Sequence, residues 1–389
     1  MKNFTWWNPT YVIFGVNTVS QIADQLAFAG IKSALLVYGG KSVFKTGVYL
    51  QISEALTKKG IEFPELVGVK PNPAIDKVRE GIARLKASMV EAVVPIGGGS
   101  AFDTAKAIAA GVFYEGDPWE LFEGKASEIK RALPIYGILT ASGTGSEVNN
   151  ISVISNPEKN IKTSFNSPLI YPRISIIDPS LQASLSEEQT VHGGVDIMSH
   201  AMERILDGAA GVALMDEIGY AIVKSMIKII PQLRSNPNDY EARAQYAWAA
   251  SLAHNGSLSC GRGDRGDFSS HKLGHSLSFL FGTSHGASLS VMMPAWARHV
   301  YKENPEPFSR FAEAVFGVEG RDEEEKALEG IELFESFFRS VGAPTTLREL
   351  KVGESDLERL TENASAYLPF GVLKPIAVED ILEIYKLAY

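Results

Sequence analysis

The feature that most constrains the fold is a change in the spacing of apolar residues near Pro179. Before this residue, short β-branched apolar runs alternate with longer helical patterns, which is typical of a parallel sheet with crossover helices. After it, nearly every segment has apolar residues at 3.6-residue spacing. The chain has 389 residues, which is long for a single hydrophobic core. We therefore expect an α/β domain over residues 1–184 and an all-α domain over residues 185–389.

The apolar runs of the first half predict strands at 34–38, 62–67, 92–96, 135–139 and 174–177. Helical patterns between them cover residues 42–58, 75–86 and 101–110. In the second half, the clearest predicted helices are 187–206, 213–233, 240–258, 269–281, 323–341 and 378–387. The stretch Ser186-Glu187-Glu188 is typical of a helix N-terminus and marks the domain boundary.

The composition excludes several classes of protein. With 45% hydrophobic and 21% charged residues, the chain has the profile of an ordinary globular protein. A net charge of -9 disfavours nucleic acid as a partner, and no apolar run approaches the roughly 18 residues that span a bilayer. Without a signal-like N-terminus, the expected location is the cytoplasm. The single cysteine, Cys260, excludes a cysteine-rich zinc site, so a metal would need histidine and carboxylate ligands.

A glycine-rich turn leads from the strand at 92–96 into the next helix, in EAVVPIGGGSAFDTAK. Glycines let the backbone approach an anion, and the first N–H groups of a helix have no partners within the helix. Gly97, Gly98, Gly99 and Ser100 are therefore candidate phosphate donors. Strand-to-helix turns also contain glycines for steric reasons, and this segment alone fits both interpretations.

A second turn, Gly39-Gly40-Lys41-Ser42, follows the strand at 34–38. In dinucleotide sites, an acidic residue at such a strand end binds the ribose 2'-hydroxyl and selects NAD. No carboxylate stands in this turn, and Lys41 and Ser42 suit a 2'-phosphate instead. We therefore expect a preference for NADP(H), the alternative being that Lys41 is only a solvated surface charge.

All seven histidines lie between His192 and His299. Asp196 and His200 are spaced i, i+4, which places both on one face of a helix. The pair His271 and His275 repeats that spacing, and His285 follows a turn at Gly282. Such polar groups are costly to bury among apolar residues unless something satisfies them, so the pattern predicts a site for Fe(II), Zn or a similar ion.

This set contains more candidates than a four-coordinate site with an open position uses, and we expect one to be spare. Spacing does not tell whether the spare residue is His271, His275 or His285.

Five motifs resemble those of the iron-containing (group III) alcohol dehydrogenases, most closely the butanol dehydrogenase-like, NADPH-dependent aldehyde reductase branch. The resemblance covers nearly the whole chain. The motifs are PNP at 71–73, GGGSAFDTAK at 97–106, TGSE at 144–147, GGVDIMSH at 193–200 and HKLGHSLSFLFGTSHG at 271–286. The resemblance implies an N-terminal dinucleotide-binding domain of Rossmann type, a C-terminal metal-binding domain and a homodimer.

The resemblance also implies roles for individual residues. The family's D-x-x-x-H pattern with two later histidines selects Asp196, His200, His271 and His285 as metal ligands, with Fe(II) as the expected ion and Zn as the alternative. His275 is then the spare residue, near the nicotinamide as a proton relay. The implied cofactor and pocket residues are Asp103, Thr140, Thr144, Asn149 and Lys162. Two departures are Lys41, where glycine is common, and Phe268, where tryptophan is frequent.

These features predict an enzyme that interconverts primary alcohols and aldehydes by hydride transfer, with a small molecule as its partner. A related enzyme of glycerol dehydrogenase or dehydroquinate synthase type is an alternative of the same fold. A zinc hydrolase is an alternative of another class, since His271 and His275 have the spacing of metalloprotease helices. It is disfavoured because Lys272 stands where that motif needs glutamate.

Overall fold

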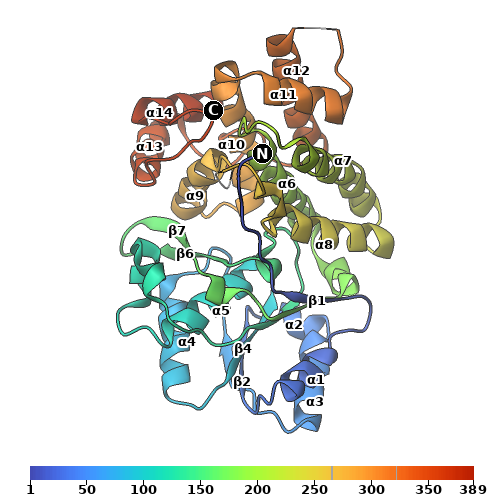
Figure 1. The fold of residues 1–389 in the computed structure, drawn as a ribbon, viewed down its shortest axis with the longest axis vertical. Helices are drawn as coiled ribbons and strands as arrows, with labels where there is room; N and C mark the ends of the chain where they lie inside the picture. The colour runs from blue at the N-terminus through green and yellow to red at the C-terminus, as the bar shows by residue number, and fades with distance from the viewer. Residues whose placement is uncertain (264–265, 321) are drawn as a thin grey trace. The chain divides into compact units, whose positions relative to one another are not determined.

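The structure is a computed structural model that describes residues 1–263, 266–320 and 322–389. The residues form two compact units (Figure 1). The first, which we call the helical unit, comprises Met1–Trp6, Ser186–Asn236 and Leu252–Tyr389; the second, the sheet unit, comprises Trp7–Leu185 and Pro237–Ser251. Neither unit is one uninterrupted segment, because residues 1–6 group with the C-terminal half and 237–251 with the N-terminal half.

The sheet unit is built on a parallel sheet of six strands in the order β1-β8-β5-β4-β2-β3. The strands are β1 (Tyr11–Phe14), β2 (Ala34–Tyr38), β3 (Glu65–Val67), β4 (Ala92–Gly97), β5 (Tyr136–Leu139) and β8 (Ile174–Ile177). This confirms the predicted α/β fold. Because all six strands are parallel, the turns that follow β2, β4 and β5 lie along the same edge of the sheet.

Helices cover the sheet on both sides, which explains why its strands have continuous apolar sequences. One buried core contains Val37, Leu66 and Ile108, and a second contains Leu36, Ile52 and Ile138. Residues of β2 alternate between these cores, as successive side chains of a strand must. The helices are α1 (Gln21–Phe28), α3 (Val48–Lys58), α4 (Ile75–Lys86) and α5 (Gly99–Gly111).

Several details of the sheet unit differ from the sequence-based expectation. Strand β1 was not predicted, and β3 covers only the second half of the predicted strand 62–67. The predicted helix 42–58 is two helices, α2 (Ser42–Lys45) and α3, because Gly47 between them has a left-handed backbone with φ 75°. Strands β6 (Ile151–Asn156) and β7 (Ile161–Asn166) form an antiparallel hairpin outside the main sheet, which was not predicted. Their polar and partly buried residues lack the apolar run by which the other strands were recognised.

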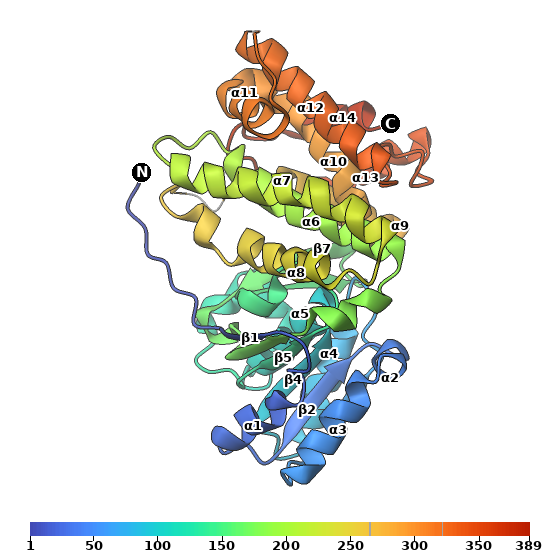
Figure 2. The ribbon, with the colours of Figure 1, turned by 90° about the vertical axis from the view of Figure 1, so that its right-hand side faces the viewer.

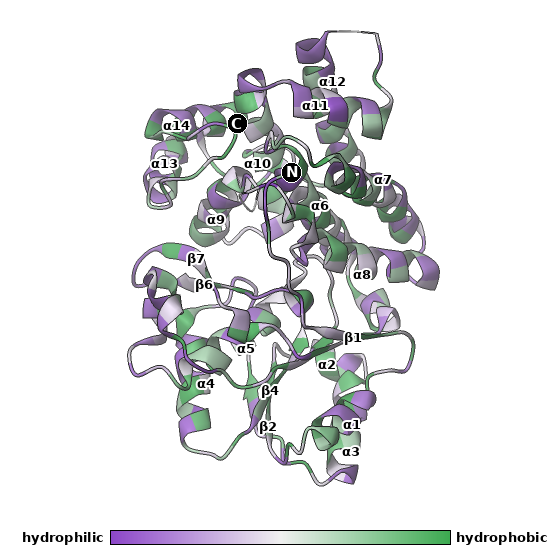
Figure 3. Ribbon diagram, in the orientation of Figure 1, coloured by the Kyte–Doolittle hydropathy of each residue, from purple (hydrophilic) through white to green (hydrophobic). Residues whose placement is uncertain are grey.

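The helical unit contains no strand in the part of it that the structure describes, in agreement with the predicted all-α half. Its main helices are α6 (Glu187–Ile205), α7 (Ala213–Ser235), α9 (Ser269–Phe281), α10 (His285–Val300), α11 (Glu306–Phe311), α12 (Glu323–Ser340), α13 (Leu357–Ser365) and α14 (Val378–Leu387). Helices α6 and α7 lie side by side along their length (Figure 2). Helix α7 carries both hydrophobic and hydrophilic residues (Figure 3), and its buried residues recur every three or four positions, as in an amphipathic helix.

Helix α8 (Tyr240–His254) is shorter than the predicted helix 240–258, since a short 3-10 turn occupies Ser257–Ser259. Helix α10 was not predicted, and the proline at 294 in its interior weakens its helical signal in the sequence. Across the described residues, no helix has both the length and the apolar character needed to cross a membrane.

Candidate active site

Helix α6 carries the first two candidate metal ligands. Ser186 begins the helix with a capping box in which its side chain and that of Gln189 satisfy each other's backbone N–H groups. Asp196 and His200 follow one turn apart on the same face, and both are buried. Asp196 Oδ1 lies 3.4 Å from His200 Nδ1. The predicted i, i+4 pair therefore faces a common point.

Two further imidazoles approach the same carboxylate oxygen from other helices. His271 Nε2, on α9, lies 3.8 Å from Asp196 Oδ1, and His285 Nε2, the first residue of α10, lies 3.6 Å from it. The ligand atoms of Asp196, His200 and His271 all lie within 4.8 Å of one another. Three helices that are separate in the sequence thus bring one oxygen and three ring nitrogens together.

These distances fit a shared cation better than direct hydrogen bonds. Two atoms bound at about 2.1 Å to one tetrahedral ion are about 3.4 Å apart, whereas N–H···O bonds are about 2.9 Å long. Among the described residues, His200 Nδ1 is buried and has no hydrogen-bond partner, which is rare for a buried polar atom. The donor set of three nitrogens and one carboxylate oxygen suits Fe(II) or Zn.

The surroundings shift the pKa values of His200 and His271 in opposite directions. Burial, reinforced by neighbouring His254, lowers the pKa of His200 well below its usual 6.5, so this ring is neutral. Burial also disfavours the charged form of His271, but the carboxylates of Glu203 and Asp196 outweigh it and raise the pKa of His271 to about 9. The carboxylates around His271 thus favour positive charge at this point.

Gly286 allows α10 to approach α6 at the site. A Cβ atom at this position would lie 1.9 Å from the carbonyl oxygen of His192, far inside van der Waals contact. Because Gly286 directly follows His285, this close approach positions the His285 ring opposite Asp196. The glycine that follows His285 is therefore required sterically, which residue spacing in the sequence did not reveal.

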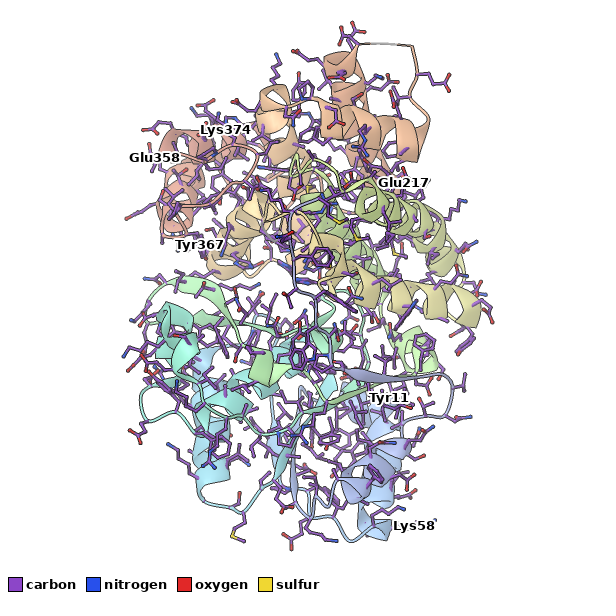
Figure 4. All side chains as sticks on the ribbon, in the orientation of Figure 1. Tyr11, Lys58, Glu217, Glu358, Tyr367 and Lys374 are labelled. Carbon is purple, nitrogen blue, oxygen red and sulfur yellow. The ribbon has the colours of Figure 1, made fainter. Side chains whose placement is uncertain are left out.

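His275 lies one turn beyond His271 on α9 and is buried. Its ring centroid is 5.8 Å from that of His285 and 6.0 Å from that of Tyr367. Tyr367 is labelled in Figure 4. His254, which had no assigned role, packs against His200 with ring centroids 3.9 Å apart. The histidine cluster therefore extends beyond the four candidate ligands, and only contact in space, not spacing, reveals His254.

In the sheet unit, the turn at Gly97–Ser100 packs tightly against the segment after β5. Helix α5 begins there without a side-chain cap. A Cβ atom on Gly98 would lie 3.1 Å from Ala141 Cβ, and one on Gly99 would lie 2.5 Å from Thr144 Oγ1. The N–H of Thr140 donates to the carbonyl of Gly97 at 2.9 Å. The glycines therefore have a steric reason, and no side chain caps the helix start that they form.

Asp103 and Asn149 meet in a buried network centred on Lys106. Lys106 Nζ donates to Ser146 Oγ at 2.8 Å and to Asn149 Oδ1 at 2.9 Å, while Asp103 Oδ1 accepts from Ser146 Oγ at 2.6 Å. Burial lowers the pKa of Lys106 to about 8, and burial raises that of Asp103 to about 6 against the opposing charge of Lys106. This network, which sequence reasoning missed, anchors the segment that carries Thr144 and Asn149.

The turn at 39–42 follows β2 beside an acidic residue that the sequence did not single out. Glu65, on β3, accepts hydrogen bonds from the hydroxyls of Tyr38 and Tyr49. Its carboxylate is therefore already engaged within the protein, and Lys41 in the turn is exposed.

Lys162 projects from β7 toward the loop after β3. Its Nζ donates to Asn72 Oδ1 at 2.8 Å, and Asn72 has a left-handed backbone with φ 52°. Asn72 is the central residue of the PNP motif, so this motif contacts Lys162 directly. Candidate residues from four separate segments of the sheet unit thus cluster around the turns after β2, β3, β4 and β5.

Comparisons with known proteins agree with this architecture. The iron-containing alcohol dehydrogenase profile matches residues 9–179, and the profile of the C-terminal domain of the Fe-containing alcohol dehydrogenase family matches residues 190–389. The chain is 38% identical to a probable NADH-dependent butanol dehydrogenase of Bacillus subtilis, over 99% of both chains. It is 31% identical to the NADPH-dependent aldehyde reductase YqhD of Escherichia coli, over 92% of both chains.

A crystal structure of NADH-dependent butanol dehydrogenase A from Thermotoga maritima superposes with a TM-score of 0.97 and 42% identity, covering 100% of this chain and 99% of that one. The chain therefore belongs to the iron-containing alcohol dehydrogenase family. It is an oxidoreductase that acts between alcohols and aldehydes. This confirms the resemblance seen in the sequence and removes the hydrolase alternative.

The role of Gly286 is testable by adding a single methyl group. Gly286→Ala should push α10 away from α6, withdraw His285 from Asp196, and weaken metal binding on the order of tenfold or more. Metal content after dialysis, measured by mass spectrometry, checks this. Gly40→Ala is the control, because a Cβ atom there would meet nothing within 4 Å. Equal metal retention in both variants would contradict the steric argument.

Proposed function

We propose that this enzyme reduces aldehydes and oxidises primary alcohols with a divalent metal, Fe(II) or alternatively Zn, held by Asp196, His200, His271 and His285. The observation that carries the proposal is the convergence of three ring nitrogens on Asp196 Oδ1 at 3.4, 3.8 and 3.6 Å. A bound divalent ion would act as a Lewis acid that polarises the oxygen of the substrate.

The chain spans both family profiles, and we propose residues 1–184 as the dinucleotide-binding domain and 185–389 as the metal-binding domain.

His275 is the residue that moves the proton of the substrate oxygen. Its ring lies beside that of His285, so it is adjacent to the metal ligands without being needed as one. An imidazole nitrogen titrates near neutral pH when unperturbed, and it can accept the proton in one direction and return it in the other. The neighbouring ring of Tyr367 holds the imidazole edge-on.

Histidine replacements separate metal binding from proton transfer. His271→Ala or His285→Ala should lose metal and activity together, because each removes a ligand nitrogen. His275→Ala should keep its metal, turn over about 100-fold or more slowly and show an altered pH profile. Metal analysis by mass spectrometry and NADPH oxidation with butanal test both effects.

The matched control is His299→Ala, an imidazole on α10 that pairs with Asp380 at 2.7 Å. It should change neither metal content nor turnover. Full metal occupancy in the His271 and His285 variants would refute the ligand set, and unchanged kinetics of His275→Ala would remove that residue from the mechanism.

The nicotinamide cofactor, which supplies or accepts the hydride, binds along the carboxyl edge of the sheet. The N–H groups of Gly97, Gly98, Gly99 and Ser100 would hold its diphosphate, since α5 begins there without a side-chain cap. Thr140 and Thr144 lie beside these glycines, and Lys162, which reaches Asn72 in the loop after β3, is proposed as a further cofactor residue. Asp103 and Asn149 fix the shape of this pocket through the Lys106 network.

The preferred cofactor is NADP(H). Gly39 and Gly40 present no carboxylate at the end of β2, and Glu65 nearby is engaged by two tyrosine hydroxyls. A 2'-phosphate would meet Lys41 and Ser42 in a turn that itself carries no carboxylate. The names of similar relatives include both NADH and NADPH, so the proposed preference rests on this turn.

Kinetics with both cofactors test the preference. NADPH should give at least a tenfold higher kcat/KM than NADH, and Lys41→Ala should raise the KM for NADPH about tenfold while sparing NADH. Lys45→Ala, at the end of the short helix that Lys41 precedes, is the control and should change neither value. A tenfold advantage for NADH in the wild-type enzyme would end the proposal.

The enzyme works as a homodimer that pairs across β1. This strand lies at one edge of the sheet and exposes Tyr11 (63%) and Phe14 (39%) (Figure 4). Trp248 is 43% exposed and packs edge-on against Phe14. An exposed, apolar edge strand invites pairing with another chain, and a two-fold axis lets the same surface serve both copies.

Sedimentation analysis checks the assembly. The wild-type enzyme should sediment with twice the mass of one chain, and the double variant Tyr11→Lys, Phe14→Lys should shift it to the monomer. Phe28→Lys is the control, because Phe28 is 92% exposed but lies on α1. A wild-type monomer, or an undisturbed dimer of the double variant, would contradict this interface.

A further inference from the structure

Glu203 is a carboxylate with no exposed surface, on the helix that carries Asp196 and His200. It follows His200 at i+3 and Asp196 at i+7, so α6 presents all three on one face. Burying a carboxylate is costly unless it is hydrogen-bonded and paired with positive charge. Its contacts should therefore account for its presence.

The contacts of Glu203 all lead to the start of α9. Oε1 accepts hydrogen bonds from the Ser270 hydroxyl and from the His271 backbone N–H, the latter at 3.1 Å, while Oε2 lies against His271 Nδ1. Helix α9 begins at Ser269, so the N–H of His271 belongs to the first turn and has no partner within its own helix. Glu203 thus caps α9 from α6, where the positive end of the helix dipole favours a carboxylate.

The Glu203 carboxylate contacts only one of the two ring nitrogens of His271. With Nδ1 of His271 against Glu203, its Nε2 faces Asp196 Oδ1 at 3.8 Å. We propose that Glu203 is the positioning residue of the metal site, which orients the His271 ring with Nε2 toward the ion and fixes the distance of α9 from the ligands on α6. A carboxylate behind a metal-bound imidazole orients the ring and increases its basicity. This inference rests on the proposed metal site.

Backbone hydrogen bonds around Glu203 also hold the start of α9 in this position relative to α6. The carbonyl of Glu203 accepts from the N–H of Asp267 at 2.7 Å. The buried carboxylate of Asp267 accepts from the N–H groups of Ser269 at 3.0 Å and of Val372 at 2.7 Å. The start of α9 is therefore held from α6 by both the side chain and the backbone of Glu203.

Glutamine is the sharpest replacement because it keeps the shape of Glu203. Three donors converge on this carboxylate: the Ser270 hydroxyl, the His271 backbone N–H and, when Nε2 faces the ion, the His271 Nδ1–H. A glutamine side chain has one acceptor oxygen and an NH₂ group that is itself a donor. At least one His271 donor therefore loses its partner in Glu203→Gln.

The experiment measures zinc affinity by chelator competition on the full-length enzyme, together with the visible absorption of the cobalt-substituted protein. E203Q should bind zinc 10- to 100-fold more weakly and change the cobalt spectrum. S270A removes a donor to the same carboxylate but keeps the ring contact, so its affinity should stay within about threefold. E147Q replaces another fully buried glutamate, which lies in the sheet unit and accepts from Ser251 Oγ at 2.6 Å, and its zinc affinity should be unchanged.

If Glu203 serves only the stability of the fold, E203Q lowers the melting temperature while zinc affinity and the cobalt spectrum stay as in the wild type, which overturns the proposal. Equal losses of affinity in E203Q and S270A overturn it as well. Should E203Q not fold, E203D decides, because it keeps the charge but withdraws it by about 1.5 Å, and wild-type affinity and spectrum in E203D refute the role. A wild-type enzyme that binds no zinc would instead disprove the proposed metal site.

Discussion

The helical unit depends on one buried carboxylate oxygen, Asp196 Oδ1. It faces nitrogen atoms of His200, His271 and His285 at distances too long for direct hydrogen bonds and suited to a shared cation. Concentrating polar groups in an apolar bundle opposes folding unless they are mutually satisfied. The packing of α6, α9 and α10 therefore has to satisfy two demands at once: close apolar contact and convergence of ligand atoms within a few ångströms.

Small residues reconcile these demands. Gly286 brings α10 so close to α6 that any side chain at this position would collide with the His192 carbonyl. Similarly, a Cβ atom on Gly274 of α9 would lie only 3.3 Å from Ser288 Cβ on α10. Glu203 then links α6 to the first turn of α9 through hydrogen bonds. The close packing and the polar links act together, because a helix that shifts by an ångström would lose both.

The sequence predicted those parts of the site that follow from regular geometry. Asp196 with His200, and His271 with His275, were recognisable because i, i+4 residues share a helix face. His285 was identified as a candidate, but choosing between it and His275 required the family motif, since both lie near the cluster. His254 and Glu203 were missed because their contacts cross between elements. Likewise, Gly47 splits a predicted helix, and the polar hairpin β6–β7 carries no apolar run.

The glycine turn at 97–99 shows why a motif alone did not decide between ligand binding and packing. Its glycines are required within the protein, since Gly98 and Gly99 lie against Ala141 and Thr144. That close approach also brings the segment after β5 beside the start of α5, and the buried Lys106 holds it there through Ser146 and Asn149. In the proposed cofactor site the same glycines would serve both roles, because they let the two turns pack together and α5 begins beside them without a side-chain cap.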